Sequence, residues 1–268
     1  MTNDKFSFLR DRLVTLSICI NGQLLLSMLM EKILLEIPGT QSIMMNTDGF
    51  EVKIPIEYED KYYQICKEWE KLTNLELEFV DYQKMIIFDV NNYISIYSNG
   101  KTKCKGRCEF ENIPLHKNRS HNIVPIAFYE YFVNNIPIED TIYNHKNIFD
   151  FCAGVKAKRS DKGGYSHYEL HSIDGSDIKK EKLSKTVRYF ISKKGKYLIK
   201  VYENGKFEHV EAPSKINNSR TKEWRVTYFN KAYYLDDFKQ YDIDYVYYIS
   251  KTRNWIAEVE NKQELSLF

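Results

Sequence analysis

The sequence lacks an apolar stretch long enough to predict a membrane span. The longest apolar run, Leu24–Leu35, is interrupted by Ser27, Glu31 and Lys32, whereas a spanning helix needs about 20 consecutive apolar residues. The N-terminus also lacks the basic start and apolar core that mark a secretory signal. We therefore predict a protein with no membrane partner and a cytoplasmic location.

Cysteine is scarce, and its number and spacing argue against a disulfide framework. The five cysteines are odd in number and widely scattered: Cys19, Cys66, Cys104, Cys108 and Cys152. This usage is typical of reduced thiols in a cytosolic setting. A zinc site built on the pair at 104 and 108 with His116 or His121 is disfavoured, because no second cysteine pair closes it.

The sequence has little net charge, but the charge is unevenly distributed. The total is +2, whereas residues 1–92 carry 9 basic and 15 acidic side chains, a net of −6. Residues 156–200 carry 13 basic and 5 acidic side chains, a net of +8. An acidic part that holds cations, joined to a basic part that holds polyanions, suits a nucleic-acid enzyme, and solvated charged surfaces would give the same bias.

Periodicity predicts an α+β fold in which an antiparallel sheet carries helices on one face. The N-terminal part reads in order as a helix, a β-hairpin, a second helix and further strands. The pattern of expected elements changes near residues 110–118. We expect two domains, 1–115 and 116–268, the second a mixed α+β region. The expected helices are 10–35, 58–72, 121–132, 138–143 and 241–260, and the expected strands are 41–56 (a hairpin), 75–97 (two or three strands), 168–173, 186–192 and 197–210.

The most informative stretch is the hairpin around Asp48. Apolar residues lead to Asn46-Thr47-Asp48-Gly49, and an alternating strand follows, which predicts a tight turn with a carboxylate at its tip. Strands hold such a carboxylate firmly enough to bind a divalent cation. Asp and Gly are equally common in turns that bind nothing.

A row of cations follows the expected sheet. Lys101, Lys103 and Lys105 alternate along one strand, so their side chains share one face, and Arg107 continues the row. Their spacing of about 6–7 Å roughly matches successive phosphates of one DNA strand. Contacts of this kind position a duplex without reading its sequence. Lysines that protect an edge strand would show the same pattern.

Several segments, taken together, resemble the C-terminal part of a family B DNA polymerase of the type carried by bacteriophages. Asn46-Thr47-Asp48-Gly49 matches the metal-binding hairpin of that family, in which Asn46 replaces a first Asp and Gly49 replaces a Ser. The lysine-rich segment at 103–106 matches a strand that contacts primer–template DNA. The other matching segments are 3–9, 20–26, 241–245 and 265–268.

The resemblance implies a palm that ends near residue 115 and a thumb that follows it. Asp48 is then the catalytic residue of this chain and a ligand of Mg²⁺, with Asn46, Thr47 and Gly49 supporting the hairpin. Lys101, Lys103, Lys105 and Arg107 then bind DNA. The implied partners are primer–template DNA and deoxynucleoside triphosphates, and the implied location is the cytoplasm of the host cell. A second basic patch at Lys156, Lys158, Arg159 and Lys162 fits DNA contact or a solvated loop.

The resemblance also shows what the sequence does not contain. The family requires another metal-binding Asp and a fingers helix that grips the triphosphate, and it usually has an exonuclease domain. We therefore expect a DNA-directed DNA polymerase fragment that needs an N-terminal half and does not polymerise alone. The alternatives are a non-catalytic DNA-binding or accessory module derived from a polymerase, and an unrelated α+β protein with a fortuitous hairpin.

Overall fold

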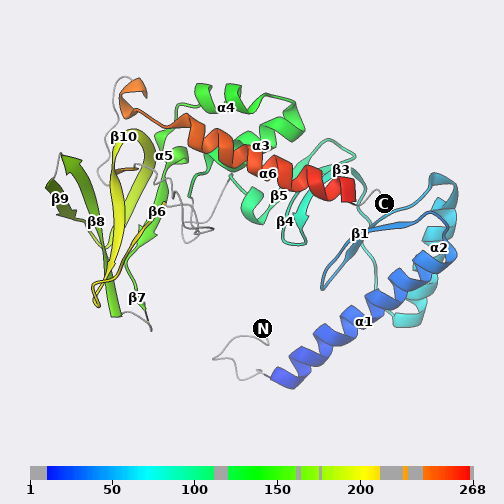
Figure 1. Cartoon of the computed structure of the whole chain (residues 1–268). Helices are drawn as coiled ribbons and strands as arrows, with labels where there is room; N and C mark the ends of the chain where they lie inside the picture. The colour runs from blue at the N-terminus through cyan, green and yellow to red at the C-terminus, as the bar shows by residue number, and fades with distance from the viewer. Residues whose placement is uncertain are drawn as a thin grey trace. The chain divides into compact units, whose positions relative to one another are not determined.

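The protein is an α+β fold with antiparallel sheets and six α-helices in its described part (Figure 1). The computed structural model describes residues 11–111, 120–160, 164–174, 177–211, 226–228 and 238–265. The helices are α1 Arg12–Glu36, α2 Glu59–Thr73, α3 Ile123–Asn134, α4 Ile138–Asn144, α5 Ile148–Phe151 and α6 Tyr245–Leu265. The strands are β1 Gln41–Met45, β2 Phe50–Lys53, β3 Tyr82–Asp89, β4 Asn92–Tyr97, β5 Thr102–Lys105, β6 Ala153–Lys156, β7 Arg159–Ser160, β8 Gly164–Asp174, β9 Asp177–Lys182, β10 Thr186–Tyr202, β11 Phe207–His209 and β12 Val226–Tyr228.

Contacts divide the chain into two compact units. The first comprises residues 1–83 with 97–99, and the second comprises 84–96 and 100–268. The boundary expected near residues 110–118 falls largely on residues that lie outside the described ones, and it stays a prediction. The resembling segment at 3–9 and most of that at 265–268 also lie outside the described residues.

In the first unit, α1 and α2 pack together through a small core. The core contains Leu29, Ile33 and Ile37 at the C-terminal end of α1, packed with Ile65 and Trp69 of α2. The indole Nε1 of the tryptophan donates to a backbone carbonyl of α1, at Leu25, over 2.9 Å. The hairpin follows α1 directly, so this core fixes the helix that leads into it.

The opposite face of α1 is apolar but exposed. Leu13, Leu16, Leu24 and Leu35 lie on this face at three- and four-residue steps or their multiples, and these side chains are 76, 56, 58 and 78% exposed. Helix α1 is the one described helix whose length and composition would allow it to cross a membrane, over Leu13–Glu36, and 17% of an apolar 18-residue stretch within it is buried. The absence of a membrane partner stays a prediction.

The second unit contains two larger assemblies of strands. Strands β3, β4 and β5 form a three-stranded sheet in that order. Helices α3 and α6 cover the same face of it, because Phe88 of β3 contacts Phe128 of α3 and Trp255 of α6 at ring-centroid distances of 4.9 and 5.6 Å. The other sheet has seven strands and is organised around β10, which pairs with β6 and β12 along its first part and with β8 and β11 along its second.

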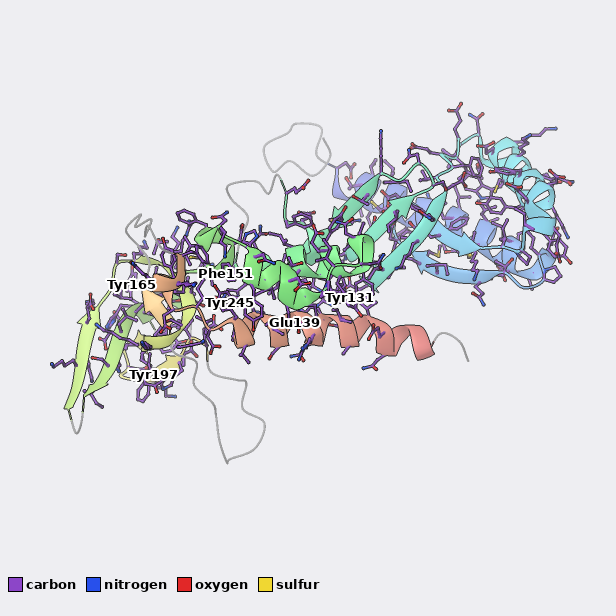
Figure 2. All side chains as sticks on the ribbon, turned by 90° about the horizontal axis from the view of Figure 1, so that it is seen from above. Tyr131, Glu139, Phe151, Tyr165, Tyr197 and Tyr245 are labelled. Carbon is purple, nitrogen blue, oxygen red and sulfur yellow. The ribbon has the colours of Figure 1, made fainter. Side chains whose placement is uncertain are left out.

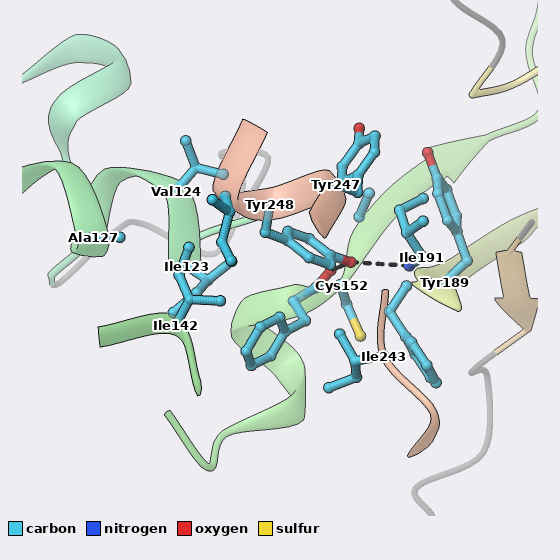
Figure 3. Packing of buried hydrophobic residues seen from close by; sticks show 14 of the residues in the cluster. Ile123, Val124, Ala127, Ile142, Cys152, Tyr189, Ile191, Ile243, Tyr247 and Tyr248 are labelled. Atoms are coloured by element: carbon cyan, nitrogen blue, oxygen red, sulfur yellow. Dashed lines mark hydrogen bonds between the residues drawn. The ribbon is translucent and has the colours of Figure 1, made fainter. Parts of the chain in front are cut away.

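Tyr248 of α6 links this sheet to the helices (Figure 3). Its side chain is fully buried, and its hydroxyl donates to the carbonyl of Phe151 over 2.7 Å and accepts from the amide of Ile191 over 2.9 Å. The large cluster around it contains Ile123, Val187 and Phe190 among other residues. One hydroxyl therefore ties α6, the end of α5 and β10 together within the second unit.

The predicted elements are confirmed in part. The hairpin and the helices at α1, α2, α3 and α4 are confirmed, and the last helix begins at residue 245 instead of 241. Two of the strands predicted within 75–97 are present as β3 and β4, but the expected start at Leu75 is wrong, because Leu75–Val80 forms no strand. The amide of Leu77 instead donates to Oε1 of Glu70 over 2.7 Å. Strands predicted at 186–192 and 197–210 are largely one long strand, β10, and β9 was not predicted.

Candidate functional site

The hairpin places Asp48 in the four-residue turn between β1 and β2. The amide of Asn46 donates to the carbonyl of Gly49 over 2.9 Å, which closes the turn. The amide of Asp48 donates to Oδ1 of the Asn46 side chain over 3.3 Å. Asn46 therefore fixes the backbone of the turn with the kind of oxygen that an aspartate would also offer. Asp48 and Thr47 are exposed, and Asn46 and Gly49 are half-buried.

The turn suits a cation ligand, but it supplies one carboxylate alone. An exposed carboxylate oxygen is a ligand that Mg²⁺ accepts, and Asp48 forms no ion pair with any described residue. Within the described ranges, no group of three His, Cys, Asp or Glu side chains is placed to hold a metal ion. The residues present therefore fit one ligand position of a magnesium site and leave the others to groups beyond these residues.

Strand β5 carries the predicted lysine row at the edge of the three-stranded sheet. Thr102 and Cys104 turn inward: the Thr102 hydroxyl lies 3.0 Å from that of Tyr129, and burial raises the pKa of the Cys104 thiol to about 11. Because side chains alternate along a strand, Lys103 and Lys105 project from the other face. Lys103 is exposed, and Lys105 is half-buried.

Two lysines of the row have different surroundings. The ammonium of Lys105 lies 5.5 Å from the ring centroid of Tyr93, its cross-strand neighbour. Lys101 precedes β5 and is exposed. Exposed lysines on an edge strand fit phosphate contact and edge protection equally well, so the DNA contacts stay a prediction.

Arg107 does not continue the row as a free cation. Its guanidinium carbon lies 3.4 Å from the ring centroid of Phe88 and 4.9 Å from that of Trp255, and its Nη2 forms an ion pair with Glu258 at 2.8 Å. This arginine therefore connects the short 3₁₀ turn after β5 to α6. If Arg107 also bound DNA as predicted, its guanidinium would have to contact a phosphate while it stays packed on Phe88 and paired with Glu258.

The sequence favours His167 and His171 as surface residues of a strand, and it does not predict the carboxylate that they share on β8. The Nε2 atoms of His167 and His171 lie 2.7 Å from the two carboxylate oxygens of Glu169. These hydrogen bonds, to His171 first, lower the pKa of the Glu169 carboxyl. Alternation along one strand is the signal that predicts a shared face, but it does not reveal that both rings meet one carboxylate.

The second basic patch is placed in part. Lys156 and Lys158 are exposed, whereas Lys162 and the side chain of Arg159 lie outside what the structure describes. Lys182 and Lys185, which the sequence analysis did not select, line the same hollow as Lys156 and Lys158.

No family model and no curated protein matches the chain.

Proposed function

We propose that the chain is the C-terminal part of a DNA-directed DNA polymerase of family B, with the end of the palm at residues 1–115 and the thumb at 116–268. The proposal rests on the resemblance of the segments described above. The observation that carries it is the exposed carboxylate of Asp48 in a turn that Asn46 holds in place. Position and exposure are what a metal ligand of this family requires.

Each part of the chain has one task in this proposal. Asp48 provides one oxygen ligand to Mg²⁺, and the hairpin strands keep that ligand in place while DNA moves. When bound, the metal ions lower the pKa of the primer 3′ hydroxyl and neutralise the leaving pyrophosphate. Lys101, Lys103 and Lys105 contact backbone phosphates and so hold the primer–template independently of its sequence.

An N-terminal polymerase half is a necessary partner in this proposal. One carboxylate does not hold two divalent cations, so the remaining carboxylates, the fingers and the exonuclease belong to an N-terminal half. We expect the chain alone to bind DNA and to incorporate no nucleotide. The alternative is a non-catalytic DNA-binding module, which the lone carboxylate favours, since such a module needs no complete metal site.

The decisive experiment is primer extension with Mg²⁺ by the chain coexpressed with an N-terminal polymerase half. Asp48→Asn should abolish synthesis, because the amide removes the charged ligand and keeps the side-chain volume. Glu76→Gln is the matched control, since Glu76 is an exposed carboxylate in the same unit and lies outside the hairpin. Synthesis that survives Asp48→Asn would favour the accessory module, and incorporation by the chain alone would refute the need for a partner.

A further inference from the structure

The second unit contains a hollow of about 610 Å³ whose rim is basic. Four exposed lysines line it: Lys156, Lys158, Lys182 and Lys185. None of the four forms an ion pair with a described residue. No carboxylate is among the residues that line the hollow. Four cations around one concavity repel each other, so an anion that enters it lowers the electrostatic free energy.

Backbone hydrogen bonds hold the walls of the hollow in place. The amide of Ala157 donates to the carbonyl of Lys185 over 2.8 Å, and the amide of Leu183 donates to that of Tyr168 over 2.8 Å. The Ser166 hydroxyl donates to the carbonyl of Lys158 over 3.0 Å. Residues that follow β6, begin β8 and follow β9 are therefore fixed to one another. The lysines stand on a prebuilt frame, which lowers the entropy cost of binding.

An aromatic ring stands beside the lysines. Tyr165 of β8 lines the hollow, is 61% exposed and is labelled in Figure 2. His167 shares its face of the strand with Glu169, which accepts hydrogen bonds from two histidines over 2.7 Å each. The carboxylate beside Tyr165 is that of Glu203, whose Oε2 accepts from the Tyr165 amide over 3.1 Å. Glu169 is paired with Lys182 across the strands. Both oxygens of this carboxylate already accept a hydrogen bond from a histidine, and Lys182 forms no described ion pair with it.

From these observations we infer that the hollow binds single-stranded nucleic acid, with phosphates on the four lysines and a base stacked on Tyr165. Lysines around a groove with an exposed aromatic ring are the combination that single-strand binding sites use. A duplex fits less well, because its base faces are already stacked and offer nothing to the ring. The inference is independent of the polymerase proposal, which places its DNA contacts on β5.

The test measures binding of a fluorescein-labelled oligothymidylate by anisotropy across a series of salt concentrations. Lys182→Gln/Lys185→Gln should weaken binding and make the slope of log K against log salt shallower by about 1.4, since each phosphate contact contributes about 0.7 on a single strand. Lys193→Gln/Lys194→Gln is the matched control, because both lysines are exposed on β10 and lie outside the hollow. The control should change the slope little.

The aromatic contact gives an independent measurement. Tyr165→Leu should weaken binding by roughly tenfold, because stacking on an aromatic side chain contributes that much per base, and should leave the salt slope unchanged. The exposed ring is not part of the core, so circular dichroism should show the variant folded. A salt slope that changes with affinity in this variant would overturn the stacking role.

Three further results would overturn the inference. In the first, both lysine pairs weaken binding equally, which would show a diffuse charge effect. In the second, Lys103→Gln/Lys105→Gln abolishes single-strand binding while the hollow variants bind normally, which would leave the polymerase proposal intact. In the third, the chain binds phosphatidylserine vesicles through these lysines and does not bind the oligothymidylate.

Discussion

The sharpest prediction concerns His121, whose burial should make the second unit sensitive to mild acid. The imidazole is 4% exposed, and its ring packs against Tyr189, Tyr247 and Tyr248. Its Nδ1 lies 2.9 Å from the ammonium of Lys251. Burial, and then the charge of Lys251, lower the pKa of His121 from 6.5 to about 3. The folded protein therefore keeps this histidine neutral at pH values where the unfolded chain protonates it.

The sign and size of the effect follow from proton linkage. Below pH 6.5 the unfolded state binds a proton that the folded state excludes, so the free energy of unfolding falls as the pH falls. The loss is about 1.4 kcal/mol per pH unit until the pH reaches the folded pKa of His121 near 3. Between pH 7.5 and 5.0 this amounts to about 2 kcal/mol.

His121→Asn removes the titrating group. Asparagine tolerates the left-handed backbone of this position, where φ is 52°. The variant should be less stable at pH 7.5, because it leaves Lys251 without the ring, but its stability should fall by about 2 kcal/mol less than that of the wild type between pH 7.5 and 5.0. Urea unfolding followed by circular dichroism at both pH values measures the difference. Equal losses in both proteins would refute the reasoning.

Three other substitutions test the packing around the candidate sites by urea unfolding. Arg107→Ala should cost about 1–3 kcal/mol, because the stack on Phe88 and the ion pair to α6 are lost together; a change below about 0.5 kcal/mol would place the guanidinium elsewhere. Gly106→Ala should cost more than about 1 kcal/mol, since φ is 65° and a Cβ would collide with the backbone of Asn91. Tyr248→Phe should cost about 1–3 kcal/mol by leaving two buried backbone groups unpaired, and a neutral result would contradict the hydrogen bonds seen here.

Local signals were sufficient for the elements that stand next to strong turn and cap residues. Helix α1 begins after Asp11, whose carboxylate accepts from the amides of Leu13 and Val14, and it ends before Pro38. Helix α2 ends at Asn74, which has a φ of 56°. The turn at Asn46–Gly49 was predicted for the same reason. Each of these features depends on residues within a few positions of one another, so the sequence contains them directly.

Long-range features could not be predicted in this way. The two predicted strands form one continuous strand, β10, whose first part pairs with β6 and whose second part pairs with β8. Local alternation does not show which strands pair, so it does not show that the two parts are continuous. The stripe at Leu13, Leu16 and Leu24 has helical spacing, but α2 covers the opposite face of α1, at Leu29 and Ile33. Periodicity shows that a face is apolar and does not show whether a neighbour covers it.

The described lysines and arginines differ in whether they already contact other residues. This difference predicts which of them bind phosphate most readily and should be tested first. Arg107 is used in packing and an ion pair, and Lys200 donates to Tyr202 and Glu208. Moving either onto a phosphate would first break these contacts. Lys156 and Lys182 are exposed on a fixed frame and have no described ion pair to break. Nucleic acid should therefore bind first at lysines of this second kind, and variants at Arg107 should report on folding before they report on DNA.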